Sequence, residues 1–232
     1  MKTIGLIGGM SWESSLEYYR IINEGVKEKL GGLHSAECLM WSFDFAEIEA
    51  LQMAGDWAAA TARMVDAAQR VERGGADCIV ICTNTMHKMA GAVQAAVKIP
   101  LLHIADTTAE KICADGLHTI GLLGTGFTME QDFYKGRLTD QFGLKVLVPD
   151  EAGRNLVHRA IYDELCLGIV RDESRQAYLK IMHDLVAQGA QGVILGCTEI
   201  TLLIKPEHTS IPLYDTTLLH AQAAVEWALK EV

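Results

Sequence analysis

Residues 75–85 read GADCIVICTNT, and residues 189–199 read GAQGVILGCTE, 114 positions further along the chain. Each stretch begins with Gly-Ala, continues as a short apolar run typical of a buried parallel strand, and ends in polar residues. The alignment pairs Thr83 with Cys197. A repeat at a fixed distance indicates a duplicated structural unit. The sequence therefore predicts two similar halves, each with a reactive side chain just after a buried strand.

Two further matches support this duplication. Residues 4–8 (IGLIG) resemble residues 120–124 (IGLLG) at an offset of 116, and residues 99–101 repeat as residues 211–213 (IPL) at an offset of 112. The three matches occur in the same order in both halves. The alternative is that the echoes come from general α/β patterning, which repeats apolar strands followed by glycine.

Strand and helix signals alternate along the whole chain. This alternation predicts parallel strands joined by right-handed helical crossovers. The predicted fold class is α/β, with two pseudo-symmetric Rossmann-like domains and mainly parallel sheets. The expected strands are Thr3–Ile7, Leu39–Phe45, Cys78–Cys82, His118–Leu123, Lys145–Val148 and Gly192–Leu195; the expected helices include one capped by Ser11 and those over Trp57–Arg73, Met129–Phe142, Asn155–Leu165, Ser174–Gln188 and Thr216–Lys230.

The repeat also predicts where the two domains meet in the chain. Residues 1–102 together with residues 214–232 form an N-terminal α/β domain that carries Thr83. Residues 103–213 form a C-terminal α/β domain that carries Cys197. Since no stretch rich in proline, glycine or serine separates them, we expect the two halves to pack closely, with the active site in the cleft between them.

Composition excludes several classes of protein. Half of the 232 residues are apolar, and the net charge is −10 with no run of basic residues, which argues against nucleic-acid binding. The six cysteines form no C-x-x-C pair, so no metal site is expected. No segment approaches 18 apolar residues, and the N-terminus lacks the pattern of a signal peptide. We therefore expect a cytoplasmic protein with no membrane contact.

Glycine turns follow the first strand of each half. Residues 5–11 read GLIGGMS, and residues 121–126 read GLLGTG, so neither completes the dinucleotide pattern G-x-G-x-x-G. One interpretation is a strand-to-helix turn that needs the backbone freedom of glycine. The other is a helix N-terminus whose free N–H groups hold an anion such as the carboxylate of an amino acid.

Three motifs resemble those of a known family. GLIGGMSWES near the start, CTNTMH at residues 82–87 and LGCTEI at residues 195–200 are similar to the aspartate/glutamate racemase family, and most of all to its YgeA-type amino-acid racemases. The resemblance extends over nearly the whole chain. It implies two similar α/β domains with the active site between them, a homodimer, an amino acid as the small-molecule substrate, and no pyridoxal phosphate, metal or nucleotide cofactor.

Racemisation places specific demands on Thr83 and Cys197. A proton leaves one face of the α-carbon and another returns to the opposite face, so two proton-carrying groups must flank the substrate. A thiol suits this task because a helix N-terminus can lower its pKa. Most family members have cysteine where this chain has Thr83, and a hydroxyl is a poor base near neutral pH. We therefore predict that Cys197 deprotonates the substrate, Thr83 returns the proton poorly, and turnover favours the L enantiomer.

Cys82 is the alternative candidate for the missing thiol. Adjacent residues of a strand point to opposite faces, so Cys82 is predicted to point into the core if Thr83 points toward the substrate. The repeat also pairs Cys82 with Gly196 rather than with Cys197.

The remaining candidates bind substrate in one interpretation and have a structural role in the other. Asn84, Thr85 and Thr198 lie where helices should begin, so they act as N-caps or bind the substrate carboxylate. Met10 lines the pocket or simply packs. Gln52 binds substrate or lies on the surface. Glu199 orients Cys197, binds the substrate ammonium group or interacts with a helix N-terminus, and His87 tunes a reactive group or lies on a helix surface.

The sequence thus predicts a cofactor-independent amino-acid racemase of the aspartate/glutamate class, with broad specificity left open. One alternative keeps Cys197 but changes the reaction, as in related enzymes that isomerise maleate, racemise hydantoins or decarboxylate malonates. Another is an amino-acid-binding protein whose catalysis is weakened by Thr83. A nucleotide-binding module is disfavoured because its glycine patterns are incomplete.

Overall fold

The structure of the protein is a computed structural model that describes residues 1–230. These residues divide into two compact units. The first comprises residues 1–104 and the segment that begins at His220, and the second comprises residues 105–219. Of the predicted N-terminal domain segment 214–232, the last two residues lie outside the described residues. Whether the two units are independent domains stays a prediction.

Each unit is built on a four-stranded parallel sheet. In the first, the order is β2 (Cys38–Ser42), β1 (Ile4–Gly8), β3 (Cys78–Ile81) and β4 (Leu101–Leu102). In the second, it is β6 (Lys145–Leu147), β5 (Thr119–Gly124), β7 (Val193–Gly196) and β8 (Leu213–Asp215). The strand order is the same in both units, which confirms the predicted α/β fold with two Rossmann-like halves.

The strand register also agrees with the sequence repeat. Gly5 lies opposite Ile79 in the first sheet, and Gly121 lies opposite Val193 in the second. These pairs correspond at offsets of 116 and 114, respectively. The pairing of β3 with β4 recurs in β7 with β8 in the same way. General α/β patterning would not reproduce the register of three neighbouring strands, so the duplication is structural.

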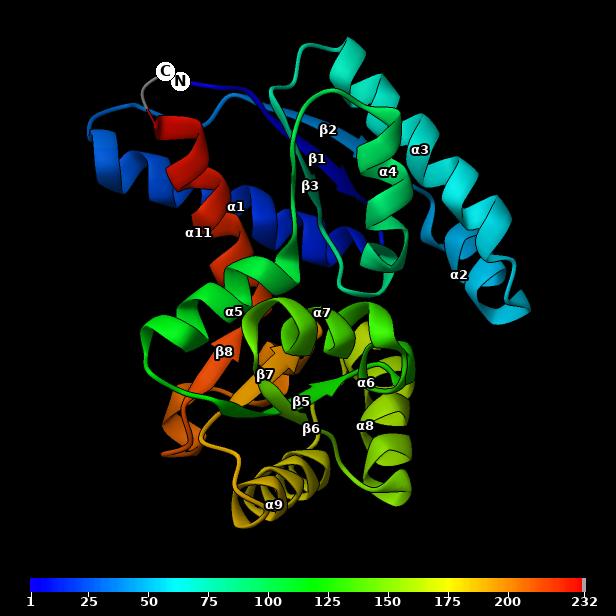
Figure 1. The fold of residues 1–232 in the computed structure, drawn as a ribbon, viewed down its shortest axis with the longest axis vertical. Coiled ribbons are helices and arrows are strands. Elements are labelled where there is room, and N and C mark those ends of the chain that lie inside the picture. The colour runs from blue at the N-terminus through cyan, green and yellow to red at the C-terminus, as the bar shows by residue number, and fades with distance from the viewer. Residues whose placement is uncertain (231–232) are drawn as a thin grey trace. The chain divides into compact units, whose positions relative to one another are not determined.

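Helices cover both faces of the first sheet (Figure 1). On one face, α1 (Trp12–Leu30) and α11 (Thr216–Leu229) pack against the side of the sheet where Leu6 of β1 and Val80 of β3 are fully buried. On the other face, Ile79 and Ile81 of β3 are enclosed by α2 (Phe45–Ala54), α3 (Trp57–Arg73) and α4 (Ala90–Ala96). The 3-10 helix η1 (Thr85–Met89) directly precedes α4. The alternation of side chains along β3 supplies both cores.

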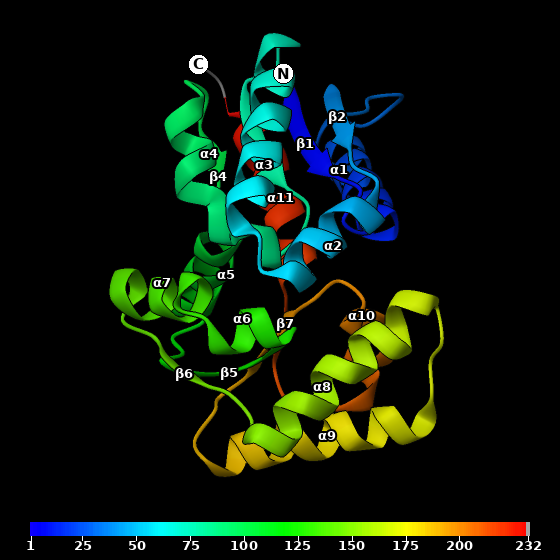
Figure 2. The ribbon, with the colours of Figure 1, turned by 90° about the vertical axis from the view of Figure 1, so that its right-hand side faces the viewer.

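The second unit has its own set of helices and a core of its own. Tyr178 is fully buried, and its hydroxyl donates to the carbonyl of Val157 at 2.9 Å, joining α9 to α8, which lie side by side in Figure 2. The helices are α5 (Ile104–Ala114), α6 (Gly126–Glu130), α7 (Asp132–Phe142), α8 (Glu151–Asp163), η2 (Leu165–Leu167), α9 (Asp172–Ala187), α10 (Ile200–Leu203) and η3 (Pro206–His208).

Two of the observed elements differ in extent from the predicted ones. The strand predicted over Leu39–Phe45 ends at Ser42, because Asp44 caps α2 by accepting from the N–H of Ala46. The helix predicted over Met129–Phe142 is interrupted at Gln131, whose ψ of 149° is extended. The predicted N-cap at Ser11 is confirmed, since its hydroxyl accepts from the N–H of Ser14 at 3.3 Å.

Gly9 is the glycine of the first turn whose replacement should cost the most. Its φ is +82°, and a Cβ there would lie 2.3 Å from the carbonyl oxygen of Phe43. We expect Gly9→Ala to lower the free energy of unfolding by about 2–4 kcal/mol, because it combines a strained φ with a backbone clash. Gly55, with a φ of +68° and open space around it, is the matched control. Both variants are measured by urea titration, in which Gly55→Ala should lower the free energy of unfolding by only about 1 kcal/mol. Equal losses in the two variants would contradict this explanation.

Candidate active site

The carboxyl edge of the first sheet gathers one group of the predicted site residues. Because β1 and β3 are adjacent and parallel, the segments that follow them emerge at the same edge. Met10 follows β1 and is buried, whereas Thr83 follows β3 and is half-buried. Asn84 and Thr85 come next in the chain and are buried at 4% and 6% exposure, respectively.

Gln52 joins this group from α2. It is 5% exposed, and its Nε2 atom donates to the sulfur of Met86 at 3.1 Å, so it is not a solvated surface residue. Met86 lies in η1, directly after Thr85. The place of Gln52 in the sequence did not show whether it is buried or exposed, because it contacts η1, which is distant in the sequence. Asn84 precedes η1 but makes no side-chain capping hydrogen bond, so the predicted capping role is not observed.

Cys82 has the core position predicted for it. It is fully buried with Ile4, Tyr18 and Val80 on the face covered by α1 and α11. Burial raises the pKa of its thiol far above the usual range. A thiol held in its neutral form away from the sheet edge is a small hydrophobic side chain. This arrangement leaves Thr83 as the remaining candidate after β3.

Two serines in the first turn of α1 hold the backbone around this edge. The hydroxyl of Ser14 donates to the carbonyl of Cys82 at 3.0 Å, and Ser15 Oγ accepts from the N–H of Gly9 at 2.7 Å. Gly8 makes room for this contact, since a Cβ at that position would lie 2.3 Å from Ser15 Oγ. The sequence analysis missed both serines, although consecutive hydroxyls at the start of a helix after a glycine turn were a usable signal.

His87 is also part of this region, and its predicted helix-surface position is wrong. It is 2% exposed, and its Nδ1 atom lies 2.8 Å from the carbonyl oxygen of Thr83. Its Nε2 atom accepts from the backbone N–H of Ile104 at 3.2 Å. The side chain therefore links the turn after β3 to the end of the unit's first segment.

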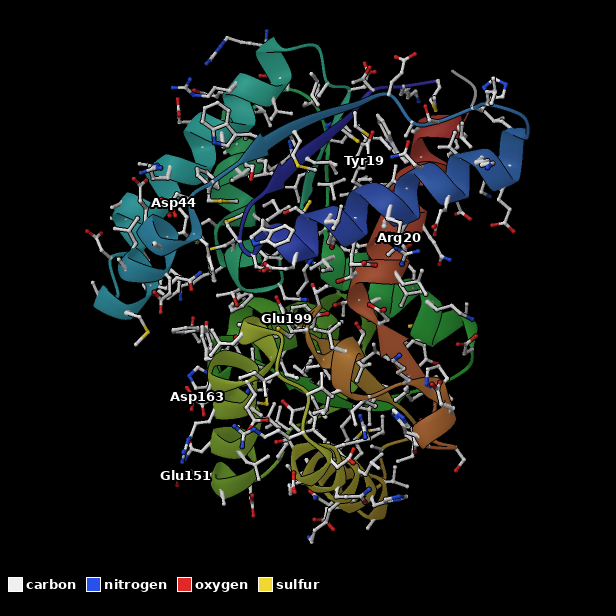
Figure 3. The ribbon with its side chains drawn as sticks, turned by 180° about the vertical axis from the view of Figure 1, so that it is seen from behind. Tyr19, Arg20, Asp44, Glu151, Asp163 and Glu199 are labelled. Carbon is white, nitrogen blue, oxygen red and sulfur yellow. The ribbon has the colours of Figure 1, made fainter. Side chains whose placement is uncertain are left out.

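The second unit places three predicted site residues in one turn. Cys197 directly follows β7, and Thr198 and Glu199 come next, all of them half-buried. The Cys197 thiol donates to Glu199 Oε2 at 2.8 Å. Glu199, labelled in Figure 3, precedes α10. The observed contact supports the interpretation in which Glu199 orients the thiol.

The pKa of Cys197 shifts in the opposite direction to the one predicted. Burial is the main cause of a pKa well above the ordinary value, followed by the negative charge of Glu199 and the hydrogen bond to it. A helix N-terminus was expected to lower it, but α10 spans only Ile200–Leu203 and supplies little dipole. These causes favour the neutral thiol over the thiolate.

Thr198 is held by neighbours on both sides. Its hydroxyl lies 3.0 Å from that of Thr217, which follows β8, and its carbonyl accepts from the hydroxyl of Thr201 at 2.7 Å. Thr217 was not predicted as part of the site. The adjacency of β7 and β8 brings it to the turn that contains Cys197.

The Glu199 contact leads to a testable shift in thiol ionisation. Because the Glu199 charge raises the pKa of Cys197, Glu199→Gln should lower that pKa, and the thiolate should form at lower pH. We expect the pH midpoint of Cys197 alkylation by iodoacetamide, followed by peptide mass spectrometry, to move toward neutrality. Glu207→Gln, an equal charge change in η3, should leave the midpoint in place. An unchanged or higher midpoint in Glu199→Gln would contradict the assignment.

Neither a metal centre nor a membrane span is found in the part of the chain that the structure describes. Within residues 1–230, no group of three or more histidine, cysteine, aspartate or glutamate side chains could hold a metal ion. No helix in that range is both long and apolar enough to cross a bilayer.

Comparisons with known proteins identify relatives of this chain. The family model described as Asp/Glu/hydantoin racemase matches residues 7–224. The broad specificity amino-acid racemase RacX of Bacillus subtilis is 23% identical over 169 residues, which cover 70% of this chain and 69% of the relative.

Two solved structures are similar over almost the full length. A protein from Yersinia pestis, presented as a candidate Asp/Glu racemase, is 55% identical with a TM-score of 0.94 and covers 99% of this chain and 100% of that one. An aspartate racemase homologue from Pyrococcus horikoshii is 34% identical with a TM-score of 0.87, at the same coverage. Matched over nearly all of its length by the family model and by these relatives, the chain belongs to the Asp/Glu/hydantoin racemase family.

Proposed function

We propose that this protein is a cofactor-independent amino-acid racemase in which Cys197 and Thr83 exchange protons with opposite faces of one substrate α-carbon. The family and its relatives support the amino-acid racemase class. Aspartate and glutamate are the first substrates to test, and the similarity to a broad specificity racemase extends the panel to neutral amino acids.

The equivalence of the two reactive positions carries this proposal. Thr83 follows β3, and Cys197 follows β7, the strand in the same place of the matching sheet. Racemisation through a planar intermediate needs one proton-carrying group for each face. A duplicated unit that presents one such group at the same sheet edge in each copy meets that requirement.

On the Cys197 side, the observed hydrogen bond suggests how the thiol becomes a base. Glu199 Oε2 is 2.8 Å from the sulfur, so the thiol proton can pass to the carboxylate and leave a thiolate beside a neutral acid. The thiolate then removes the α-proton of an L-amino acid. The positive charge of a substrate ammonium group would favour the thiolate, which the free site disfavours.

On the Thr83 side, the hydroxyl gives its proton to the opposite face of the carbanion and regains one from solvent. A hydroxyl donates to a strong base far more readily than it abstracts a proton from carbon at neutral pH. The forward direction from the L enantiomer uses Thr83 as an acid, whereas the reverse requires it as a base. This asymmetry supports preferential turnover of L substrates.

The remaining predicted residues are proposed to bind the substrate. Met10, Gln52, Asn84 and Thr85 lie with Thr83 at one sheet edge, and Thr198 and Glu199 lie with Cys197 at the other. Backbone N–H groups of these turns suit the substrate carboxylate. The homodimer and the cytoplasmic location stay predictions.

One experiment tests the proposal directly. Purified protein is incubated in deuterated water with each enantiomer of aspartate, glutamate and several neutral amino acids. Deuterium incorporation at the α-carbon and optical inversion are followed separately. We expect both from L substrates, and slower inversion from D substrates.

Each other outcome points to a different function. Exchange without any inversion would indicate a one-sided Cys197 site. Binding without exchange would favour an amino-acid-binding protein with weakened catalysis. Absence of binding and exchange, with turnover of maleate, a hydantoin or a malonate, would favour one of the related reactions and overturn the proposal.

A further inference from the structure

The backbone on both sides of Thr83 is held by side chains from different elements. The carbonyl of Cys82 accepts from Ser14 Oγ at 3.0 Å, and the carbonyl of Thr83 lies 2.8 Å from His87 Nδ1. These two carbonyls belong to the peptide groups that precede and follow the Thr83 α-carbon. Because the planes of both peptide groups are restrained, the direction of the Thr83 Cα–Cβ bond is restrained as well.

The partners of His87 determine where its proton lies. The Thr83 carbonyl can only accept a hydrogen bond, so Nδ1 must carry hydrogen. The N–H of Ile104 can only donate, so Nε2 must have a free lone pair. The observed pattern therefore requires a neutral imidazole with its hydrogen on Nδ1.

The surroundings of His87 restrict its ring. The ring centroids of His103 and His220 lie 4.6 Å and 5.6 Å from that of His87. His220 is itself fixed, since its Nδ1 lies 2.9 Å from Tyr18 Oη and its Nε2 lies 2.8 Å from the carbonyl of Leu102. A ring rotation of His87 would lose two hydrogen bonds inside a packed interior, which leaves one orientation.

The second unit uses the corresponding position in a similar way. Thr201 lies 114 residues after His87, and its hydroxyl donates to the carbonyl of Thr198, one residue after Cys197. In both units, a side chain at this position of the repeat therefore binds a carbonyl of the turn that carries the reactive residue. Recurrence in the two copies supports a role connected with that turn.

We propose that His87 is a positioning residue that aims the Thr83 hydroxyl at the substrate α-carbon through its hydrogen bond to the Thr83 carbonyl. This inference rests on the proposed function. A hydroxyl is a weak acid and a weaker base, so its proton transfer depends on precise alignment with the reacting carbon. Cys197 lies in the other unit and does not depend on this hydrogen bond.

Two isosteric variants separate the two hydrogen bonds of His87. The amide nitrogen of asparagine occupies nearly the position of Nδ1, so His87→Asn keeps a donor for Thr83. The amide of glutamine reaches the position of Nε2, so His87→Gln keeps an acceptor for Ile104 but has no donor for Thr83. Both remove the ring, so their losses of stability should be similar, which thermal unfolding checks.

The variants are assayed with the substrate that the wild type turns over fastest in deuterated water. We expect His87→Gln to lower the rate of inversion about 10- to 100-fold, while exchange that retains the L configuration stays within about twofold. His87→Asn should retain most of the inversion. In a Thr83→Ala background, His87→Gln should cause no further loss, because the two residues then act as one unit.

The outcomes distinguish a failure of this inference from a failure of the proposed function. If Thr83→Ala itself leaves inversion unchanged, the proposed function is wrong. If Thr83→Ala abolishes inversion but His87→Gln reduces exchange and inversion equally, or His87→Asn is no better, the positioning role is wrong. Should both His87 variants fail to fold, Ser14→Ala decides, since it removes the other restraint: a selective loss of inversion supports the inference, and unchanged inversion overturns it.

Discussion

Cys197→Ser is expected to lower both α-proton exchange and inversion by about 1000-fold or more. The substitution changes one atom but replaces a thiol by a hydroxyl, which is almost never ionised near neutral pH. In the proposed mechanism Cys197 removes the proton from L substrates, so no later step can proceed without it. A 1000-fold loss corresponds to about 4 kcal/mol of transition-state stabilisation.

The controls use two other cysteines. Cys113 is exposed, so Cys113→Ser should retain wild-type rates. Cys82→Ala should retain exchange with some loss of stability, because Cys82 is fully buried in the core. Exchange that survives in Cys197→Ser but disappears in Cys82→Ala would reverse the assignment of the base.

Thr83→Cys is expected to raise the rate of inversion from D substrates by about 10- to 100-fold. The ordinary pKa of a thiol is about 8.5, so a small fraction is thiolate near neutral pH and can act as a base, whereas the hydroxyl cannot. Its backbone is already held by Ser14 and His87, so the sulfur should take the direction of the hydroxyl. The L-to-D rate should change less, because donation to a carbanion is possible from either group. The measurement is the ratio of the two initial rates by chiral chromatography.

Thr139→Cys is a suitable control for this variant. Thr139 lies exposed on α7, so a thiol there changes neither proton-carrying group. Its rates from both enantiomers should match those of the wild type. A Thr83→Cys protein with an unchanged ratio of rates would contradict the pairing of Thr83 with Cys197.

The repeat shows how far a local pattern can predict this protein. Alternating strands and helices, three matched segments and their offsets were enough to predict an α/β fold with two similar sheets. The same alignment paired Thr83 with Cys197, and side-chain alternation assigned Cys82 to the core. These features depend on residues close together in the chain, so their signals survive in the sequence.

The burial of polar side chains and the shifts of their pKa values were harder to predict from the sequence. Gln52 and His87 are polar residues for which a surface position was a reasonable interpretation. Each is instead buried, and each contacts a segment that is distant in the sequence. The predicted pKa shift of Cys197 had the wrong direction because the helix after it is short, whereas desolvation and the charge of Glu199 raise the pKa. A helix dipole can be anticipated from a sequence, whereas the desolvation that outweighs it cannot.

The amino-acid sequence alone thus determined the fold class, the duplication and the equivalent positions of Thr83 and Cys197 after their strands. Tertiary structure decided which polar groups are buried, which hydrogen bonds hold Thr83, and in which direction the pKa of Cys197 shifts. The physical reason is the distance along the chain over which each property is decided. Periodicity and strand endings are properties of neighbouring residues, but desolvation and hydrogen bonding depend on the atoms that folding brings together from separate parts of the chain.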